Sequence, residues 1–197
     1  MYSLGNFGFL TRTHLQKMHN LKSNRNTSRV MKDLEEFTIM KRHYLRNGEA
    51  VYYLNQKGRE LTGIEKEWRW SENIEHHLMK NDLYLFFDQP KKWKLEEKVT
   101  FRVGSGLQFK EYVLIPDITF VKDEKYHFIE VDYTQSMKEN KKKINLYKEL
   151  TLLMEKQFRY KPIVVFYTTT EHRKKMLKKW CEEKQLEYII LTKEDLR

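Results

Sequence analysis

Two carboxylate-bearing segments in the second half of the chain have the residue types needed for metal-assisted chemistry. Pro116-Asp117 lies in one predicted strand, and Glu130-Val131-Asp132 closes the next one. Carboxylates on adjacent strands of a hairpin can converge on one divalent cation, and Mg²⁺ accepts oxygen ligands while it keeps several waters. Asp117 and Glu130, with the Val131 carbonyl, could therefore hold Mg²⁺ or Mn²⁺, and the metal would activate water to attack a phosphodiester.

The same segments resemble the PD-(D/E)XK nuclease motif, and this resemblance implies a lysine two residues after the glutamate. Asp132 occupies that position here. Because an aspartate cannot supply positive charge, either catalysis is lost or a cation reaches the site from another element. Lys142 or Lys143, on the following predicted helix, could project back toward the site. A structural alternative stays open, since Pro-Asp is common in turns and Asp132 or Thr134 could cap that helix.

The segments around these carboxylates predict an α/β domain over residues 67–197. Helices are expected at about 71–86, 136–158 and 170–184. Strands are expected at 99–103, 112–121, 126–131, 162–167 and 188–191. The order α-β-β-β-α-β-α-β combines a hairpin with crossover helices. It predicts a three-layer mixed sheet like that of restriction-endonuclease-like domains.

Residues 1–66 have a different pattern, which predicts a winged helix-turn-helix. Thr13 and Gln16 have the spacing of a capping box at the start of one helix. A second helix is expected to begin at Thr27 or Ser28. An alternating segment, an Asn-Gly turn and a returning strand then predict a basic hairpin. Trp68 and Trp70 follow this region, and we expect them to pack between the two domains.

The basic and polar side chains of this first region suit contact with DNA. The N-terminal residues of a second helix can enter a major groove, and a wing can reach phosphates or the minor groove. The candidate DNA-binding residues are Asn26, Thr27, Ser28, Arg29, Lys32, Lys41, Arg42 and Arg46. Two alternatives remain open: the charges could simply solvate the surface, or the winged helix could bind a protein.

Composition favours an anionic partner. The formal net charge is +10, and residues 1–70 carry 13 Lys and Arg against 7 Asp and Glu. Double-stranded DNA is therefore the leading expected partner. No apolar run approaches the roughly 20 residues that span a bilayer, so no membrane partner is expected. One cysteine, Cys181, and no recognisable signal peptide favour a cytoplasmic location.

Several segments together resemble the replication-relaxation family of plasmids and other mobile elements. They are GFLTRTHLQKMHNL, RVMKDLEEF, VYYLNQKGRELTG and EVDYTQS followed by KKKINLY. The resemblance implies a role in replication, transfer or regulation, and it matches Lys143 and Tyr147 to a Lys and a Tyr on one helix face. A helix before Gly8 is absent or very short here, so we expect this domain to borrow packing from a neighbouring segment or from a homodimer partner.

Three functions follow from these observations. The first is a DNA-binding accessory or regulatory protein with an inactive nuclease-like domain, alongside replication or transfer proteins; in this case no cofactor is needed. The second is an Mg²⁺- or Mn²⁺-dependent endonuclease or nickase. The third is a winged-helix module that binds protein. The candidate catalytic residues are Asp117, Glu130, Asp132 and Lys143, of which Asp117 and Glu130 are also the candidate metal ligands.

Overall fold

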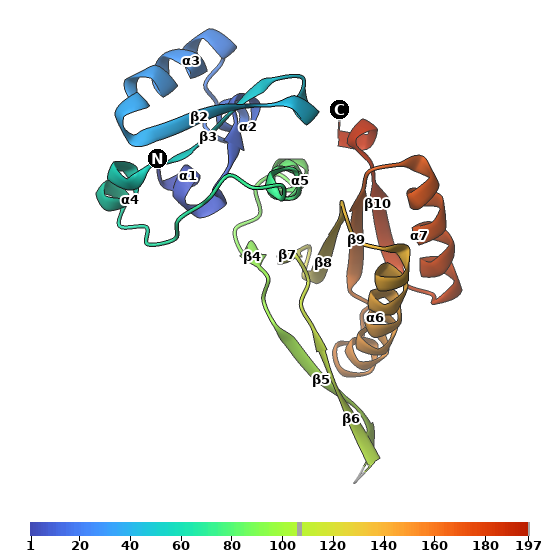
Figure 1. The fold of residues 1–197 in the computed structure, drawn as a ribbon. Helices are drawn as coiled ribbons and strands as arrows, with labels where there is room; N and C mark the ends of the chain where they lie inside the picture. The colour runs from blue at the N-terminus through green and yellow to red at the C-terminus, as the bar shows by residue number, and fades with distance from the viewer. Residues whose placement is uncertain (106–107, 197) are drawn as a thin grey trace. The chain divides into compact units, whose positions relative to one another are not determined.

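The computed structural model describes residues 1–105 and 108–196, which form two compact units, Met1–Gln89 and Pro90–Arg197 (Figure 1). Sequence patterns placed a boundary after residue 66 instead. The difference arises because the helix at Ile74–Phe86 packs against the helix at Arg12–Met18 and the strand at Leu10–Thr11, all in the first unit. Among the described residues, we find no helix with the length and apolar character to cross a membrane.

The first unit contains short helices around a small antiparallel sheet, whose strand order is β1-β3-β2. Its strands are β1 (Leu10–Thr11), β2 (Thr38–His43) and β3 (Glu49–Leu54). Its helices are α1 (Tyr2–Phe7), α2 (Arg12–Met18), α3 (Asn24–Asp33), α4 (Gln56–Thr62) and α5 (Ile74–Phe86), with 3-10 turns η1 (Glu35–Phe37) and η2 (Tyr44–Arg46). The short α1 agrees with the expectation of a reduced first helix.

Capping side chains set the starts of α2 and α3, and both helices begin earlier than expected. Thr11, not Thr13, caps α2: its hydroxyl accepts from the His14 amide at 3.1 Å, and His14 Nδ1 accepts from the Thr11 amide at 3.2 Å. Thr13 instead donates its hydroxyl to Glu49 at 2.6 Å. Ser23 caps α3, whose start therefore precedes the expected Thr27 or Ser28.

The core of the first unit includes a residue that we expected between domains. Trp68 is 8% exposed and packs with Phe9, Val51 and Tyr53, and its indole donates to the Gly5 carbonyl at 3.1 Å. Trp68 is therefore a core residue of the first unit. Its packing against α1 and the sheet replaces the predicted role at a domain junction.

The second unit is built on a five-stranded mixed sheet with the order β10-β9-β8-β7-β4. β8, β9 and β10 are parallel, whereas β7 is antiparallel to both β8 and β4. The elements are β4 (Lys94–Leu95), β5 (Val99–Ser105), β6 (Gln108–Leu114), β7 (Ile118–Lys122), β8 (Lys125–Asp132), α6 (Met137–Phe158), β9 (Ile163–Thr168), α7 (Glu171–Glu183), β10 (Glu187–Leu191) and η3 (Lys193–Leu196).

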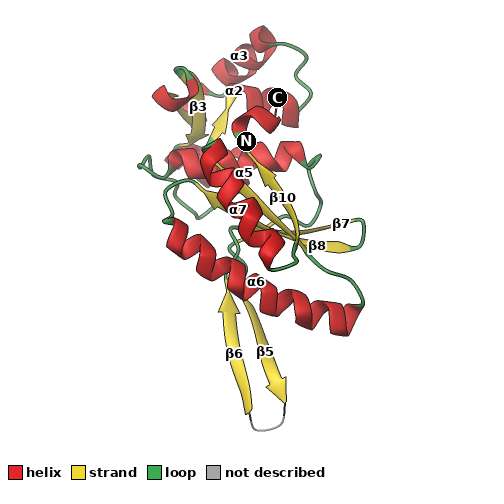
Figure 2. Cartoon of the chain, turned by 90° about the vertical axis from the view of Figure 1, so that its right-hand side faces the viewer, coloured by secondary structure: helices red, strands yellow, loops and turns green. Residues whose placement is uncertain are grey.

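Two features of this unit differ from the predicted three-layer mixed sheet. The strand expected at 112–121 is interrupted by Ile115, Pro116 and Asp117, and the residues before the break pair with β5 as a separate hairpin. Proline lacks the amide hydrogen that a continuous ladder requires. Within this unit α6 and α7 pack against each other on one face of the sheet, so they form one helical layer rather than two (Figures 1 and 2).

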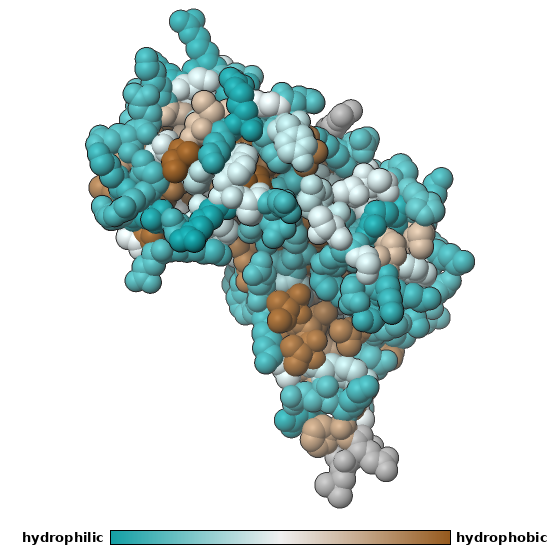
Figure 3. Space-filling view, in the orientation of Figure 1, coloured by the Kyte–Doolittle hydropathy of each residue, from teal (hydrophilic) through white to brown (hydrophobic). Residues whose placement is uncertain are grey.

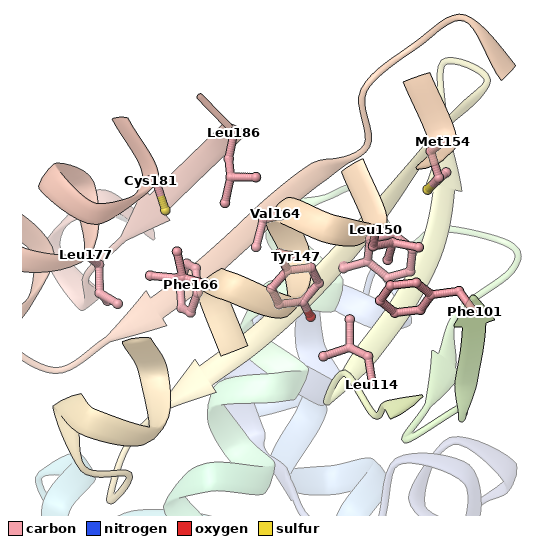
Figure 4. Packing of buried hydrophobic residues seen from close by; sticks show 12 residues of the cluster. Phe101, Leu114, Tyr147, Leu150, Met154, Val164, Phe166, Leu177, Cys181 and Leu186 are labelled. Carbon is pink, nitrogen blue, oxygen red and sulfur yellow. The ribbon is translucent and has the colours of Figure 1, made fainter. Parts of the chain in front are cut away.

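Helix α6 supplies the centre of the second core. Tyr147, Leu150 and Met154 meet residues from β9, α7 and the β5–β6 hairpin (Figure 4). Cys181 is fully buried there, and burial raises the pKa of its thiol to about 12, so it is an inert core residue. Figure 3 shows a patch of hydrophobic surface in this unit. Val113 of β6 is 44% exposed.

Candidate functional site

Asp117 and Glu130, which the sequence paired, lie together in the second unit. Asp117 immediately precedes β7, and its Oδ2 accepts a hydrogen bond from the Val131 amide at 2.8 Å. Glu130 lies in β8 and is 0% exposed. The Val131 bond fixes the Asp117 carboxylate beside the end of β8. The two carboxylates are near enough for the charge of Asp117 to raise the pKa of Glu130.

Helix α6 brings two donors to the Glu130 carboxylate. Lys143 Nζ donates to Oε2, and the Tyr147 hydroxyl donates to Oε1 at 2.7 Å. Lys143 and Tyr147 are four residues apart and share a helix face, as the sequence predicted. Lys142 points elsewhere and pairs with Glu139 at 2.7 Å. A cation from α6 therefore reaches the cluster, and that cation is Lys143.

The pKa of the Glu130 carboxyl lies near neutral pH. Burial raises the pKa of this carboxyl to about 7; Lys143 opposes the rise, while Asp117 adds to it. Burial and the nearby negative charge of Glu130 hold the pKa of Tyr147 well above its usual value, so its hydroxyl remains a donor. The cluster can thus hold or release a proton at the Glu130 carboxylate near physiological pH.

Asp132, a candidate catalytic residue from the sequence, is held by side chains of three other elements. Its Oδ1 accepts from Asn140 at 2.7 Å and from Arg173 at 2.5 Å, and its Oδ2 accepts from Thr168 and Arg173, each at 2.7 Å. Burial pushes the pKa of Asp132 upward, but these hydrogen bonds outweigh it and the pKa is lowered. Four donors engage its two oxygens, so Asp132 joins β8 to β9, α6 and α7.

The predicted metal ligands Asp117 and Glu130 lie close together, and Glu130 is already engaged by donors from α6. Both Glu130 oxygens already accept hydrogen bonds, and Lys143 places a positive charge at the carboxylate. Residues 1–105 and 108–196 contain no group of three or more His, Cys, Asp or Glu side chains that could hold one metal ion. The cluster thus consists of two carboxylates, Asp117 and Glu130, with Lys143 and Tyr147 as donors to Glu130.

A basic surface in the first unit contains most of the predicted DNA-binding residues. Ser28, Arg29 and Lys32 are exposed on α3, and Lys41 and Arg42 are exposed on β2. Asn26 is partly exposed, and its Oδ1 accepts from Arg29 at 3.2 Å. A shallow groove lies between α3 and β2, lined by Ser28, Met31, Lys32, Glu35, Thr38, Met40 and Tyr52. We call the exposed residues Ser28, Arg29, Lys32, Lys41 and Arg42 the α3–β2 surface. Within it Lys41 and Arg42, adjacent in β2, project from opposite faces of the strand, and Lys41 Nζ lies 5.3 Å from the centre of the Trp70 ring.

Two predicted DNA-binding residues lie outside this surface. Thr27 is 0% exposed, and its hydroxyl donates to the Ser23 carbonyl at 3.0 Å. The Arg46 side chain is 8% exposed and faces α5, where its Nη2 lies 2.9 Å from Glu75 Oε1 and 2.8 Å from Asp82 Oδ2. Neither side chain can reach a phosphate in this conformation, since Thr27 is enclosed and Arg46 is already paired with carboxylates.

The partners of Arg46 form an ion-pair network that the sequence reasoning missed. His14 Nε2 donates to Asp82 at 2.7 Å, and His43 Nε2 to Glu75 at 3.0 Å. Burial pushes the pKa of Asp82 upward, but hydrogen bonds from His14 and Arg46 outweigh it and lower the pKa to about 2. A signal was present: Glu75 and Asp82 are seven residues apart, which places both on one helix face.

The two units, with their several sheets and helices, define a mixed α/β protein. A family model described as Replication-relaxation matches residues 1–165. The chain belongs to this family.

The comparison with solved structures finds a similarity to protein VC1899 from Vibrio cholerae. The sequence identity is 16% and the TM-score 0.41. The aligned region covers 84% of this chain but only 39% of the length of that protein. No curated protein matches the chain.

Proposed function

We propose that the chain is a DNA-binding accessory or regulatory protein of plasmid or mobile-element replication or transfer. In this proposal α2, α3 and the β2–β3 hairpin act as a winged helix-turn-helix, and the second unit is a nuclease-like domain that does not cleave. The observation that carries the proposal is the α3–β2 surface. Arg29 and Lys32 on α3 and Arg42 on β2 are exposed, and Lys32 lines the groove between these two elements.

The chemistry of this surface suits double-stranded DNA. Recognition helices place their N-terminal residues against base edges, and basic side chains on neighbouring elements bind phosphate. Ser28 and Arg29 are the fifth and sixth of the ten residues of α3, so they lie at its middle. Arg42 also donates to the Gly48 carbonyl at 3.0 Å, which holds its side chain along the hairpin. We therefore assign base contacts to α3 and phosphate contacts to β2.

Fluorescence anisotropy with a labelled duplex tests this assignment. Arg29→Ala combined with Lys32→Ala should weaken binding at least tenfold, since each lost contact contributes on the order of 1 kcal/mol or more. Lys57→Gln is the matched control, because Lys57 is exposed on α4 and pairs with Glu36 instead. Unchanged affinity in the double variant would reject the surface. A chain that binds no duplex even at low salt, but forms a stable protein complex, would favour a protein-interaction module.

A second candidate function is phosphodiester cleavage, and one observation favours it. Lys143 reaches Glu130 beside Asp117, which supplies the cation that Asp132 cannot. Supercoiled plasmid incubated with Mg²⁺ or Mn²⁺ distinguishes the two functions. Nicking that is lost in Asp117→Asn would establish a nuclease. Intact plasmid, or nicking that persists in that variant, supports the non-catalytic proposal.

A further inference from the structure

A pocket of about 560 Å³ opens in the second unit, apart from the Asp117–Glu130 cluster. It lies among β4, β5, the β7–β8 hairpin and the C-terminal half of α6. Most of its lining is aliphatic or aromatic: Val99, Phe101, Phe120, Val121, Tyr126, Phe128, Leu150, Leu153, Met154 and Phe158. Small-molecule sites in proteins commonly measure about 300–1,000 Å³. The volume is therefore sufficient for one nucleotide-sized ligand.

A buried hydroxyl group in this pocket has an unmet hydrogen-bonding requirement. Thr119 on β7 lines the pocket and is 3% exposed, and its Oγ1 has no hydrogen-bond partner among the described residues. Leaving a buried hydroxyl unsatisfied costs free energy that a polar ligand atom can recover. A ligand that carries a hydrogen-bond donor or acceptor would supply the missing partner of the Thr119 hydroxyl.

The rim of the pocket is positively charged. Lys92, Lys94 and Lys98 line it, against a single acidic residue, Glu97, which pairs with Lys94 at 2.5 Å. Lys94 is the register partner of Thr119 across β4 and β7, so the rim and the buried hydroxyl are adjacent. Three ammonium groups around one carboxylate favour a ligand that carries negative charge, such as a phosphate.

Aromatic rings are available next to this charged rim. Tyr126 is 41% exposed and Phe158 is 53% exposed, and both line the pocket. The Tyr126 ring is nearly parallel to that of Phe128, with an interplanar angle of 7°. Any nucleobase can stack on an exposed aromatic ring of this kind, because every base has a π-face. An apolar chain would use the same rings, but it would satisfy neither Thr119 nor the lysines.

We propose that this pocket binds a nucleotide. The base packs against the aromatic lining and bonds to the Thr119 hydroxyl, and the phosphate lies at Lys92, Lys94 and Lys98. A free mononucleotide and an unpaired nucleotide of single-stranded DNA share this chemistry. The pocket involves no residue of the α3–β2 surface, so the inference does not depend on duplex binding by the first unit.

Titration of the full chain with dTMP, and separately with fluorescein-labelled oligo(dT) of 12 nucleotides, tests the proposal. Phe158→Ala should weaken binding about tenfold through lost stacking. Lys92→Gln with Lys98→Gln should weaken it at least as much and reduce its salt dependence. Thr119→Val should also weaken it, whereas Thr119→Ser, which keeps the hydroxyl, should bind as the unaltered chain does. Lys156→Gln is the matched control, because Lys156 is exposed on α6 outside the pocket.

The two probes also identify the source of the nucleotide. Binding of dTMP that competes with the oligonucleotide indicates a free-nucleotide site, and binding of the oligonucleotide alone indicates a single strand. Both outcomes support the proposal if the pocket variants, with unchanged circular dichroism, are weakened and Lys156→Gln is not. It is overturned if neither probe binds or if Phe158→Ala and the double lysine variant bind normally. Binding of decanoate in preference to either probe would also overturn it.

Discussion

Arg46 binds both carboxylate oxygens of Asp82, with Nη1 3.0 Å from Oδ1 and Nη2 2.8 Å from Oδ2. This pair joins η2, at the tip of the β2–β3 hairpin, to α5. Because His14 of α2 also donates to Asp82, one carboxylate links the hairpin, the first helix of the α2–α3 pair and α5. The network thus fixes the hairpin relative to α2, which the α3–β2 surface requires.

Removal of Asp82 should destabilise the first unit strongly. Asp82→Ala removes the bidentate partner of Arg46 and the acceptor of His14, and leaves the Arg46 side chain, which is only 8% exposed, with Glu75 alone. Breaking a buried pair by removing one partner typically costs about 3–5 kcal/mol. Urea denaturation should show a loss of this order. Lys57→Gln, in an exposed pair with Glu36, should change the midpoint little. A loss no larger than that of the control would contradict the role assigned to the network.

Acid should weaken the same network at a defined pH. The pKa of Asp82 is lowered to about 2 in the folded chain, from a usual value of 3.8. The folded carboxylate therefore contributes stability above about pH 4 that is lost as pH falls toward 2. The difference corresponds to about 2 kcal/mol. The unfolding free energy of the unaltered chain should fall relative to Asp82→Asn over that interval, and parallel curves would contradict it.

Glu130 should have the opposite dependence. Its pKa is raised to about 7 from 4.5, so its folded-state stability is greatest below about pH 4.5 and is lost as pH rises through 7. Glu130→Gln cannot ionise and escapes this loss. The variant should gain about 3 kcal/mol relative to the unaltered chain between pH 4.5 and 8. Thermal unfolding at both pH values measures the change, and a constant difference would show that folding does not raise the pKa of Glu130.

Asp132→Ala tests the structural role of the residue in the nuclease lysine position. It removes the acceptor of Arg173, Asn140 and Thr168 from a fully buried position. We expect destabilisation of about 3 kcal/mol or more, measured by denaturant unfolding. Duplex binding below the unfolding transition should remain intact. A variant that is as stable as the unaltered chain but has altered DNA cleavage would instead indicate that Asp132 is catalytic.

The carboxylate cluster was largely predictable because its parts follow local rules. The predicted hairpin brings Asp117, just before β7, next to Glu130 in β8, and helical periodicity brings Lys143 and Tyr147 to one face. From residue spacing alone, either Lys142 or Lys143 could supply the positive charge at Glu130. Its selection depends on how α6 packs against β8, and that packing is tertiary information.

The role of Arg46 was not predictable by the same means. Arg46 lies in a basic hairpin, and its acidic partners lie in α5, which sequence patterns assigned to the other domain. Including α5 also changes the distribution of charge. Met1–Gln89 carries 14 Lys and Arg against 11 Asp and Glu, whereas Pro90–Arg197 carries 24 against 17. The second unit thus has the larger positive excess, in keeping with an anionic ligand there.

The salt dependence of duplex binding tests the central claim most directly. Each lysine or arginine that neutralises a phosphate contributes about 0.9 to the slope of log K against log salt. The double variant Lys41→Ala, Arg42→Ala should lower that slope by about 1 to 2, because β2 is assigned the phosphate contacts. Lys57→Gln should leave it unchanged. A slope in the double variant equal to that of the unaltered chain would contradict DNA binding through the α3–β2 surface.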